Sequence, residues 1–259
     1  MKVKLLNTYS VAAILLMTAA AGLIAIALLS HLGEFVTAAF VISGMVCAIT
    51  GIFLITFSGG EPVDPRFVGI LPVQGCINLF RIAFNLGIKG NAYFLPPRIT
   101  GEARVMQYNP VSTYTGGPVP ATGPFPETGE KGLVLVPSCD PLVQVLKKRH
   151  GLILPDKKEQ LIQILREVTG EIFELSPRVS VRWNGNTIII VLQRYRFIEG
   201  CRVIAQEAPD SCARSPCPVC SLCGALIAEG MDTVIMLEQC SISPSGQDVI
   251  INCSVVSGA

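Results

Sequence analysis

The sequence predicts an α+β protein in which an N-terminal transmembrane helical hairpin precedes a domain built on an antiparallel or mixed sheet. Two long apolar runs near the N-terminus predict the hairpin, and strand-like runs joined by short turns predict the sheet. The order helix–strand–strand occurs three times, at residues 73–108, 157–193 and 217–256. This order favours helices on one face of the sheet and argues against a parallel doubly wound fold, whose strands need long crossovers.

The composition points to a membrane and away from nucleic acid. Of the 259 residues, 50% are apolar and 15% are charged, whereas soluble domains carry about 25% charged residues. Twenty Lys and Arg against nineteen Asp and Glu give a net charge of +1. No basic field is available for a phosphate backbone, so the expected partners are the lipid bilayer and an unidentified protein, not nucleic acid.

Two apolar segments predict the hairpin within residues 1–60. Residues 11–29 and 35–57 carry no charge, and a helix of either length covers a hydrocarbon core of about 30 Å. We therefore expect spans at about residues 10–30 and 35–57. A cleaved signal peptide is the alternative for the first run, but that run exceeds the usual apolar length of about 7–15 residues and a second run follows at once.

The charges beside the hairpin predict its orientation. Lys2 and Lys4 precede the first span, Arg66 follows the second, and the turn between the spans contains no Lys or Arg. Because Lys and Arg are retained on the cytoplasmic side of a membrane, both termini are expected in the cytoplasm. The sequence thus predicts a two-span protein of the cell membrane.

Residues 61–259 follow the hairpin and are numerous enough for a cytoplasmic domain with a substantial core. Residues 67–88 look at first like a third span, but Arg81 would place an unpaired charge in the bilayer. The spacing of apolar residues instead predicts an amphipathic helix over residues 73–86, whose apolar face packs on the domain or lies at the membrane surface.

The other elements follow from local patterns in chain order. Strands are predicted at residues 91–95, 103–108, 133–136, 179–183, 187–193, 233–238 and 248–256, and helices at residues 141–148, 157–169 and 217–230. A Pro/Gly-rich loop is predicted at residues 109–132. Asp140 and Asp156 are the expected N-caps of the first two of these helices, and Asn184-Gly185 predicts a type I′ turn.

Four grouped cysteines are the chemically distinctive feature of the chain. Their spacing is Cys212-x4-Cys217-x2-Cys220-x2-Cys223. Soft thiolate ligands at such spacings suit a structural zinc, or an iron–sulfur cluster with Cys240 or Cys253 as a distant partner. Three ligands along one straight helix converge poorly on a single metal, so Cys212 is expected to join Cys217 and Cys220 and to leave Cys223 to the core.

Two other interpretations of these thiols stay open. Buried cysteines can simply pack as small apolar side chains. Alternatively, Cys217-Pro218-Val219-Cys220 at a helix start can act as a redox pair, because the helix dipole lowers a thiol pKa there. Thioredoxin-like proteins place such a pair directly after a strand, whereas residues 208–216 look like a loop. In a reversed orientation the cysteines would be disulfide candidates.

The function expected from these patterns is that of a structural, scaffolding or sensory module more than that of an enzyme. The chain contains no P-loop, dinucleotide-binding, metalloprotease or serine-hydrolase motif. The alternative is a redox protein that depends on the thiols, or on zinc or an iron–sulfur cluster, at the four grouped cysteines.

Three features together resemble an uncharacterised family of archaeal membrane-anchored proteins. They are the N-terminal hairpin, Ala92-Tyr93-Phe94-Leu95-Pro96-Pro97-Arg98, and Cys217-Pro218-Val219-Cys220-Ser221 ahead of a helix that ends Ala228-Glu229-Gly230. The resemblance covers most of the chain and implies a two-helix hairpin followed by a cytoplasmic α+β domain. It implies no catalytic residues, because the family has no assigned activity.

Overall fold

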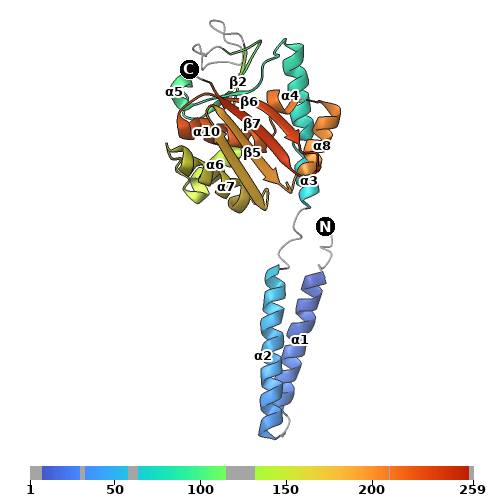
Figure 1. Cartoon of the computed structure of the whole chain (residues 1–259). Helices are drawn as coiled ribbons and strands as arrows, with labels where there is room; N and C mark the ends of the chain where they lie inside the picture. Colours follow the sequence, from blue (N-terminus) through green and yellow to red (C-terminus); the bar gives the residue numbers. More distant parts are fainter. Residues whose placement is uncertain (1–7, 30–32, 58–63, 115–131, 210, 257–259) are drawn as a thin grey trace. The chain divides into compact units, whose positions relative to one another are not determined.

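The computed structural model describes the chain except for residues 1–7, 30–32, 58–63, 115–131, 210 and 257–259 (Figure 1). The chain divides into two compact units, Met1–Val63 and Asp64–Ala259. The first contains a pair of apolar helices, and the second contains a seven-stranded antiparallel sheet with helices. The predicted α+β class is therefore confirmed.

The first unit is a hairpin of helices α1 (Thr8–Leu29) and α2 (Glu34–Phe57). The helices approach closely at small residues of α2, since a Cβ atom at Gly44 would lie 2.8 Å from Ile24 of α1. Away from this contact the apolar side chains are exposed, with Leu29 at 83% and Phe35 at 88%. Helices that are apolar on every side are typical of a lipid environment.

Three described segments are long and apolar enough to cross a membrane: Val11–Leu29, Glu34–Thr56 and Phe67–Asn85. The third belongs to the second unit, and a turn at residues 71–72 divides it into α3 (Pro65–Ile70) and α4 (Val73–Asn85). The predicted helix over residues 73–86 corresponds to α4, which buries Val73, Cys76 and Ile77. These apolar helices suggest membrane association.

The sheet has the order β3-β2-β1-β6-β7-β5-β4, and each pair of neighbours is antiparallel. Its strands are β1 (Tyr93–Leu95), β2 (Met106–Pro110), β3 (Gly132–Leu135), β4 (Arg178–Asn184), β5 (Thr187–Gln193), β6 (Ile235–Ile242) and β7 (Val249–Val255). The three predicted strand pairs are each formed. Strand β6 joins the first pair to the third, so the N- and C-terminal parts of the domain share one sheet.

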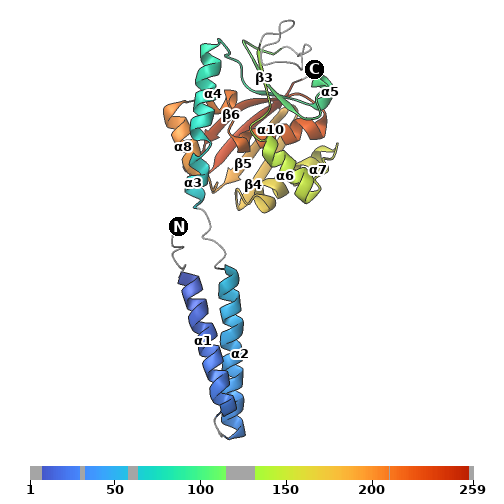
Figure 2. The same cartoon turned by 180° about the vertical axis from the view of Figure 1, so that it is seen from behind.

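Helices cover one face of this sheet. Figures 1 and 2 show α10 (Pro218–Met231) lying along that face, with α6 (Asp140–His150) and α7 (Lys158–Glu167) to one side and α4 and α8 (Ile198–Glu207) to the other. The remaining described helical segments are α5 (Pro97–Thr100), the π-helical turn Val168–Ile172 and α9 (Ser211–Arg214).

The main core lies between α10 and the sheet. Strand β5 explains why, since Ile188, Ile190 and Leu192 are fully buried and alternate with more exposed residues. They pack in one cluster with Leu222 and Leu226 of α10. A smaller cluster covers the sheet near β1 and β2, where Tyr93 and Tyr108 each contact Tyr114 edge to face, at 5.3 and 5.5 Å between ring centroids.

Several local predictions need correction. Asp140 is the first residue of α6 and the N-cap is Cys139, while Lys157 instead of Asp156 caps α7. The hairpin turn is Gly185-Asn186, because Asn184 still pairs with Thr187. Only Gly185 of these two has a positive φ, +57°, which fits a type II′ turn better than type I′. Most of the predicted loop, residues 115–131, lies outside the described residues.

Candidate metal centre

Two short helical segments place three of the grouped thiols. Cys212 lies in α9, Cys217 is the N-cap of α10, and Cys220 lies in the first turn of α10. Cys217 has extended backbone angles, φ −63° and ψ 162°, and Pro218 starts the helix, an arrangement that proline favours. The predicted helix start is therefore confirmed. The stretch 208–216 was expected to be a loop, but it contains α9.

Hydrogen bonds from other parts of the domain hold α9 and the segment that follows it. The Ala92 backbone N–H donates to the Ala213 carbonyl oxygen at 2.8 Å, and the Asn109 side-chain amide donates to the Arg214 carbonyl oxygen at 2.7 Å. The Ser138 hydroxyl donates to the Pro216 carbonyl oxygen at 2.9 Å. These bonds come from three separate parts of the chain, so the fold fixes α9, which carries Cys212, and the segment that leads to Cys217.

The Sγ atoms of Cys212, Cys217 and Cys220 all lie within 4.8 Å of one another, and all three residues are buried. Ligands on a tetrahedral zinc, with Zn–S bonds of about 2.3 Å, stand about 3.8 Å apart. The three thiols are therefore close enough to share a single metal ion once their Sγ–Sγ distances shorten slightly, from at most 4.8 Å to about 3.8 Å.

Cys223 is not part of this group. It lies one turn further along α10 and is fully buried in the main core, in the same cluster as Cys139 and Cys253. Burial raises the pKa of the Cys223 thiol to about 12, as expected for a thiol in apolar surroundings. Of the four cysteines predicted as metal ligands, the structure thus brings together three.

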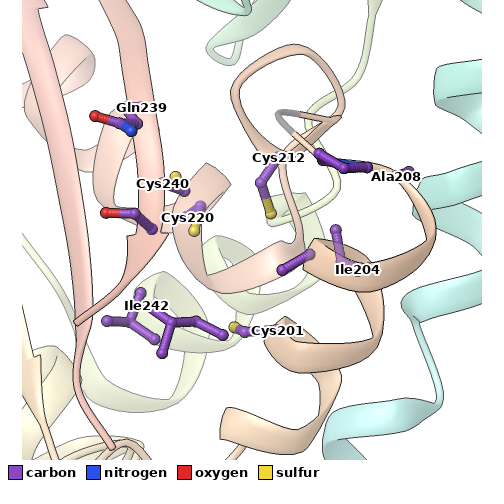
Figure 3. Close-up of a pocket in the computed structure, with 12 residues that line it drawn as sticks. Cys201, Ile204, Ala208, Cys212, Cys220, Gln239, Cys240 and Ile242 are labelled. Carbon is purple, nitrogen blue, oxygen red and sulfur yellow. The ribbon is translucent and has the colours of Figure 1, made fainter. Parts of the chain in front are cut away.

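Two further cysteines share a cavity with this group. The cavity has a volume of about 270 Å³, and Cys212, Cys220, Cys201 of α8 and Cys240 of β6 all line it (Figure 3). In Figure 3 the sulfurs of Cys220 and Cys240 lie beside each other, and Cys212 faces them. None of the described residues that line this cavity is charged.

The electrostatics favour one thiolate in the group. Hydrogen bonds from the thiols of Cys217, Cys220 and Cys240 hold the pKa of Cys212 well below its usual range, and the Cys217 backbone N–H adds to this. The hydrogen bond to Cys212 raises the pKa of Cys217, of Cys220 and of Cys240, because each of these thiols donates its S–H to the Cys212 sulfur and must stay protonated to do so. A second thiolate beside the first is also disfavoured by charge repulsion.

The arrangement can bind a soft metal or take part in thiol–disulfide exchange. No described residue lining the cavity offers a carboxylate or an imidazole, so the thiols are the titratable side chains there. The sequence indicates Cys240 only as one of two distant partners and does not single out Cys201. The signal that selects Cys240 is a strand irregularity in β6, which the sequence pattern does not reveal.

Comparison with known proteins supplies a family and no activity. A family model described as a domain of unknown function, DUF7982, matches residues 15–255. No curated protein and no solved structure matches the chain.

Proposed function

This chain belongs to the DUF7982 family of domains of unknown function, and we propose that it is a membrane-anchored structural, scaffolding or sensory module with a metal centre in its cytoplasmic domain. Cys212, Cys217 and Cys220 hold the metal in this proposal. The observation that carries it is the meeting of their three buried sulfurs within 4.8 Å, at a segment that other parts of the domain hold in place.

Zinc is the metal that suits this spacing best. In an iron–sulfur cluster the cysteines bind different iron atoms, which separates their sulfurs more widely than ligands on one ion. Thiolates that share one tetrahedral metal stand about 3.8 Å apart, close to the arrangement observed. A structural zinc also suits a cavity whose described lining residues are uncharged and include four cysteines.

Three observations support the membrane anchor and its two spans. Helices α1 and α2 expose apolar side chains all round, whereas α4 turns Val73, Cys76 and Ile77 into the core of the second unit. Helix α3 also packs on the residues that lead into α8, since a Cβ atom at Gly69 would lie 2.9 Å from Phe197. The resemblance to archaeal membrane-anchored proteins supports the same placement, and the lysines before α1 favour cytoplasmic termini.

Elemental analysis of the full chain, purified in detergent, tests the metal. We expect one zinc per chain. A Cys217→Ser variant should lose it while α10 stays intact, because serine is itself a favoured N-cap residue. A Cys223→Ser variant is the matched control and should keep its zinc. Metal-free wild-type protein, or equal zinc in both variants, would overturn the proposal.

Reporter fusions test the topology. We expect a reporter that is active only in the cytoplasm to be active when it is fused after Ala259. A reporter that is active only outside the cytoplasm should be active when it is inserted between residues 30 and 34. If α3 and α4 formed a third span, the two reporters would be found on the same side of the membrane.

The second candidate function is thiol redox chemistry, which the lowered pKa of Cys212 favours. Oxidation would join two of the three thiols in a disulfide and pass two electrons and two protons to a disulfide oxidant. Mass spectrometry after treatment with a small-molecule disulfide distinguishes the two functions. A zinc-loaded protein should resist this treatment, whereas a redox protein should form one disulfide rapidly and reversibly.

A further inference from the structure

We propose that Cys240 is the fourth ligand of the metal centre, which makes it a closed four-cysteine site that ties strand β6 to α9 and α10. The inference rests on the proposed metal-binding function and extends it. It joins three thiols within residues 212–220 to a thiol that is distant in sequence.

A β-bulge in β6 brings Cys240 to the helix-covered face. Leu237 pairs with Cys253, but Gln239 pairs with the next partner residue, Asn252, so Glu238 is an extra residue in the strand. In a regular strand, Cys240 would be on the face opposite Leu237, because alternate side chains point to opposite faces. The extra residue reverses the alternation, and Cys240 instead pairs with the fully buried Ile251.

The result of the bulge is visible around the cavity. Cys240 lines it together with Cys212 and Cys220, and in Figure 3 its sulfur lies beside that of Cys220 with Cys212 facing both. Bulges commonly re-aim a side chain toward a functional site. Here the re-aimed side chain is the one soft ligand that the sheet contributes to this cavity among the described residues.

A fourth thiolate changes the character of the site. Structural zinc sites have four protein ligands, whereas catalytic sites keep one position for water or substrate. With Cys240 bound, no position stays open, so the metal stabilises the packing of the helices on the sheet. Cys201 lines the same cavity from α8, but in Figure 3 its sulfur lies apart from those of Cys212, Cys220 and Cys240. It therefore provides a matched control.

X-ray absorption and chelator competition on the zinc-loaded full chain in detergent test the proposal. The wild type should show four sulfurs at about 2.3 Å from zinc. Cys240→Ser should show three, and its zinc affinity should fall by more than about 100-fold, since even second-shell changes cost 10–100-fold. Cys201→Ser and Cys253→Ser should keep four sulfurs and wild-type affinity. Cys240→His should restore tight binding, because histidine also ligates zinc.

The outcomes separate the two proposals. Wild-type protein without zinc defeats the metal-binding function itself. Zinc bound by three sulfurs in the wild type, with full affinity in Cys240→Ser, defeats only the role of Cys240. Loss of a sulfur in Cys201→Ser but not in Cys240→Ser does the same. Because Cys240→His keeps a ligand, recovery of affinity in that variant shows that loss in Cys240→Ser comes from the missing ligand and not from misfolding.

Discussion

Individual residues decide how closely α10 can approach the sheet. Gly224 lies in the middle of this helix, directly over Phe94 of β1, and a Cβ atom at Gly224 would overlap the phenyl ring. Phe94 is fully buried, so the ring has no free space into which it can move. The position therefore requires a residue without a side chain, for reasons of packing and not of backbone conformation.

We predict that Gly224→Ala destabilises the domain by about 1–3 kcal/mol, the usual cost of overpacking a core. In a domain of this size, each kcal/mol lowers the Tm by about 2–4 °C. A thermal melt in detergent measures the change. The matched control is Gly75→Ala in α4, where a Cβ atom would have no neighbour within 4 Å. There alanine should be neutral or stabilise by up to about 1 kcal/mol. Equal Tm values for the two variants would contradict this packing argument.

The positions of some single residues were predictable and those of others were not. Cys212, Cys217 and Cys220 could be grouped from sequence because the start of α10 is marked by Pro218, and helical spacing then separates Cys223 from them. Gly224 could not be interpreted in this way, because its neighbour Phe94 is 130 residues away and their contact depends on the whole sheet.

At the scale of elements, the sequence marks secondary structure better than it marks the buried face. Residues 188–192 of β5 are all apolar, so the sequence predicts the strand, whereas the alternation in burial appears only in the structure. In α4 the apolar spacing includes the buried Ile77, but Phe84 on the same stripe is 52% exposed. The arms of the β4–β5 hairpin also pair as predicted. The turn shifts by one residue because pairing continues through Asn184 and Thr187, which leaves Gly185 to supply the positive φ.

The bulge in β6 marks the point at which periodicity fails. An extra residue in a strand has no signature in composition, and Cys240 by simple alternation would be on the open face. Helix caps fail for a related reason. Side chains of the Asp type cap many helices, but α6 and α7 begin one residue away from the expected position, and neither has a side-chain cap bond. Details that shift a side chain by one position depend on tertiary packing.

At the scale of the whole molecule, the candidate centre joins the two layers of the domain. Cys212, Cys217 and Cys220 belong to the helical layer, whereas Cys240 belongs to a central strand that also joins the N- and C-terminal parts of the sheet. A metal bound there is coupled to folding, because the unfolded chain does not hold the four thiols together. Its removal should therefore lower the stability of the entire domain and not only that of one loop.

Chelation measures this coupling directly. At a metal concentration a thousand times the Kd, binding contributes about 4 kcal/mol to stability, which corresponds to about 8–16 °C in the Tm of a domain this large. We predict a fall of that order when a strong zinc chelator is added to the full chain in detergent, with recovery when zinc is returned. Cys217→Ser should melt at the lower temperature with or without chelator. If removal of the zinc left the wild-type Tm unchanged, the metal would not contribute to the stability of the domain, and packing alone would hold its layers together.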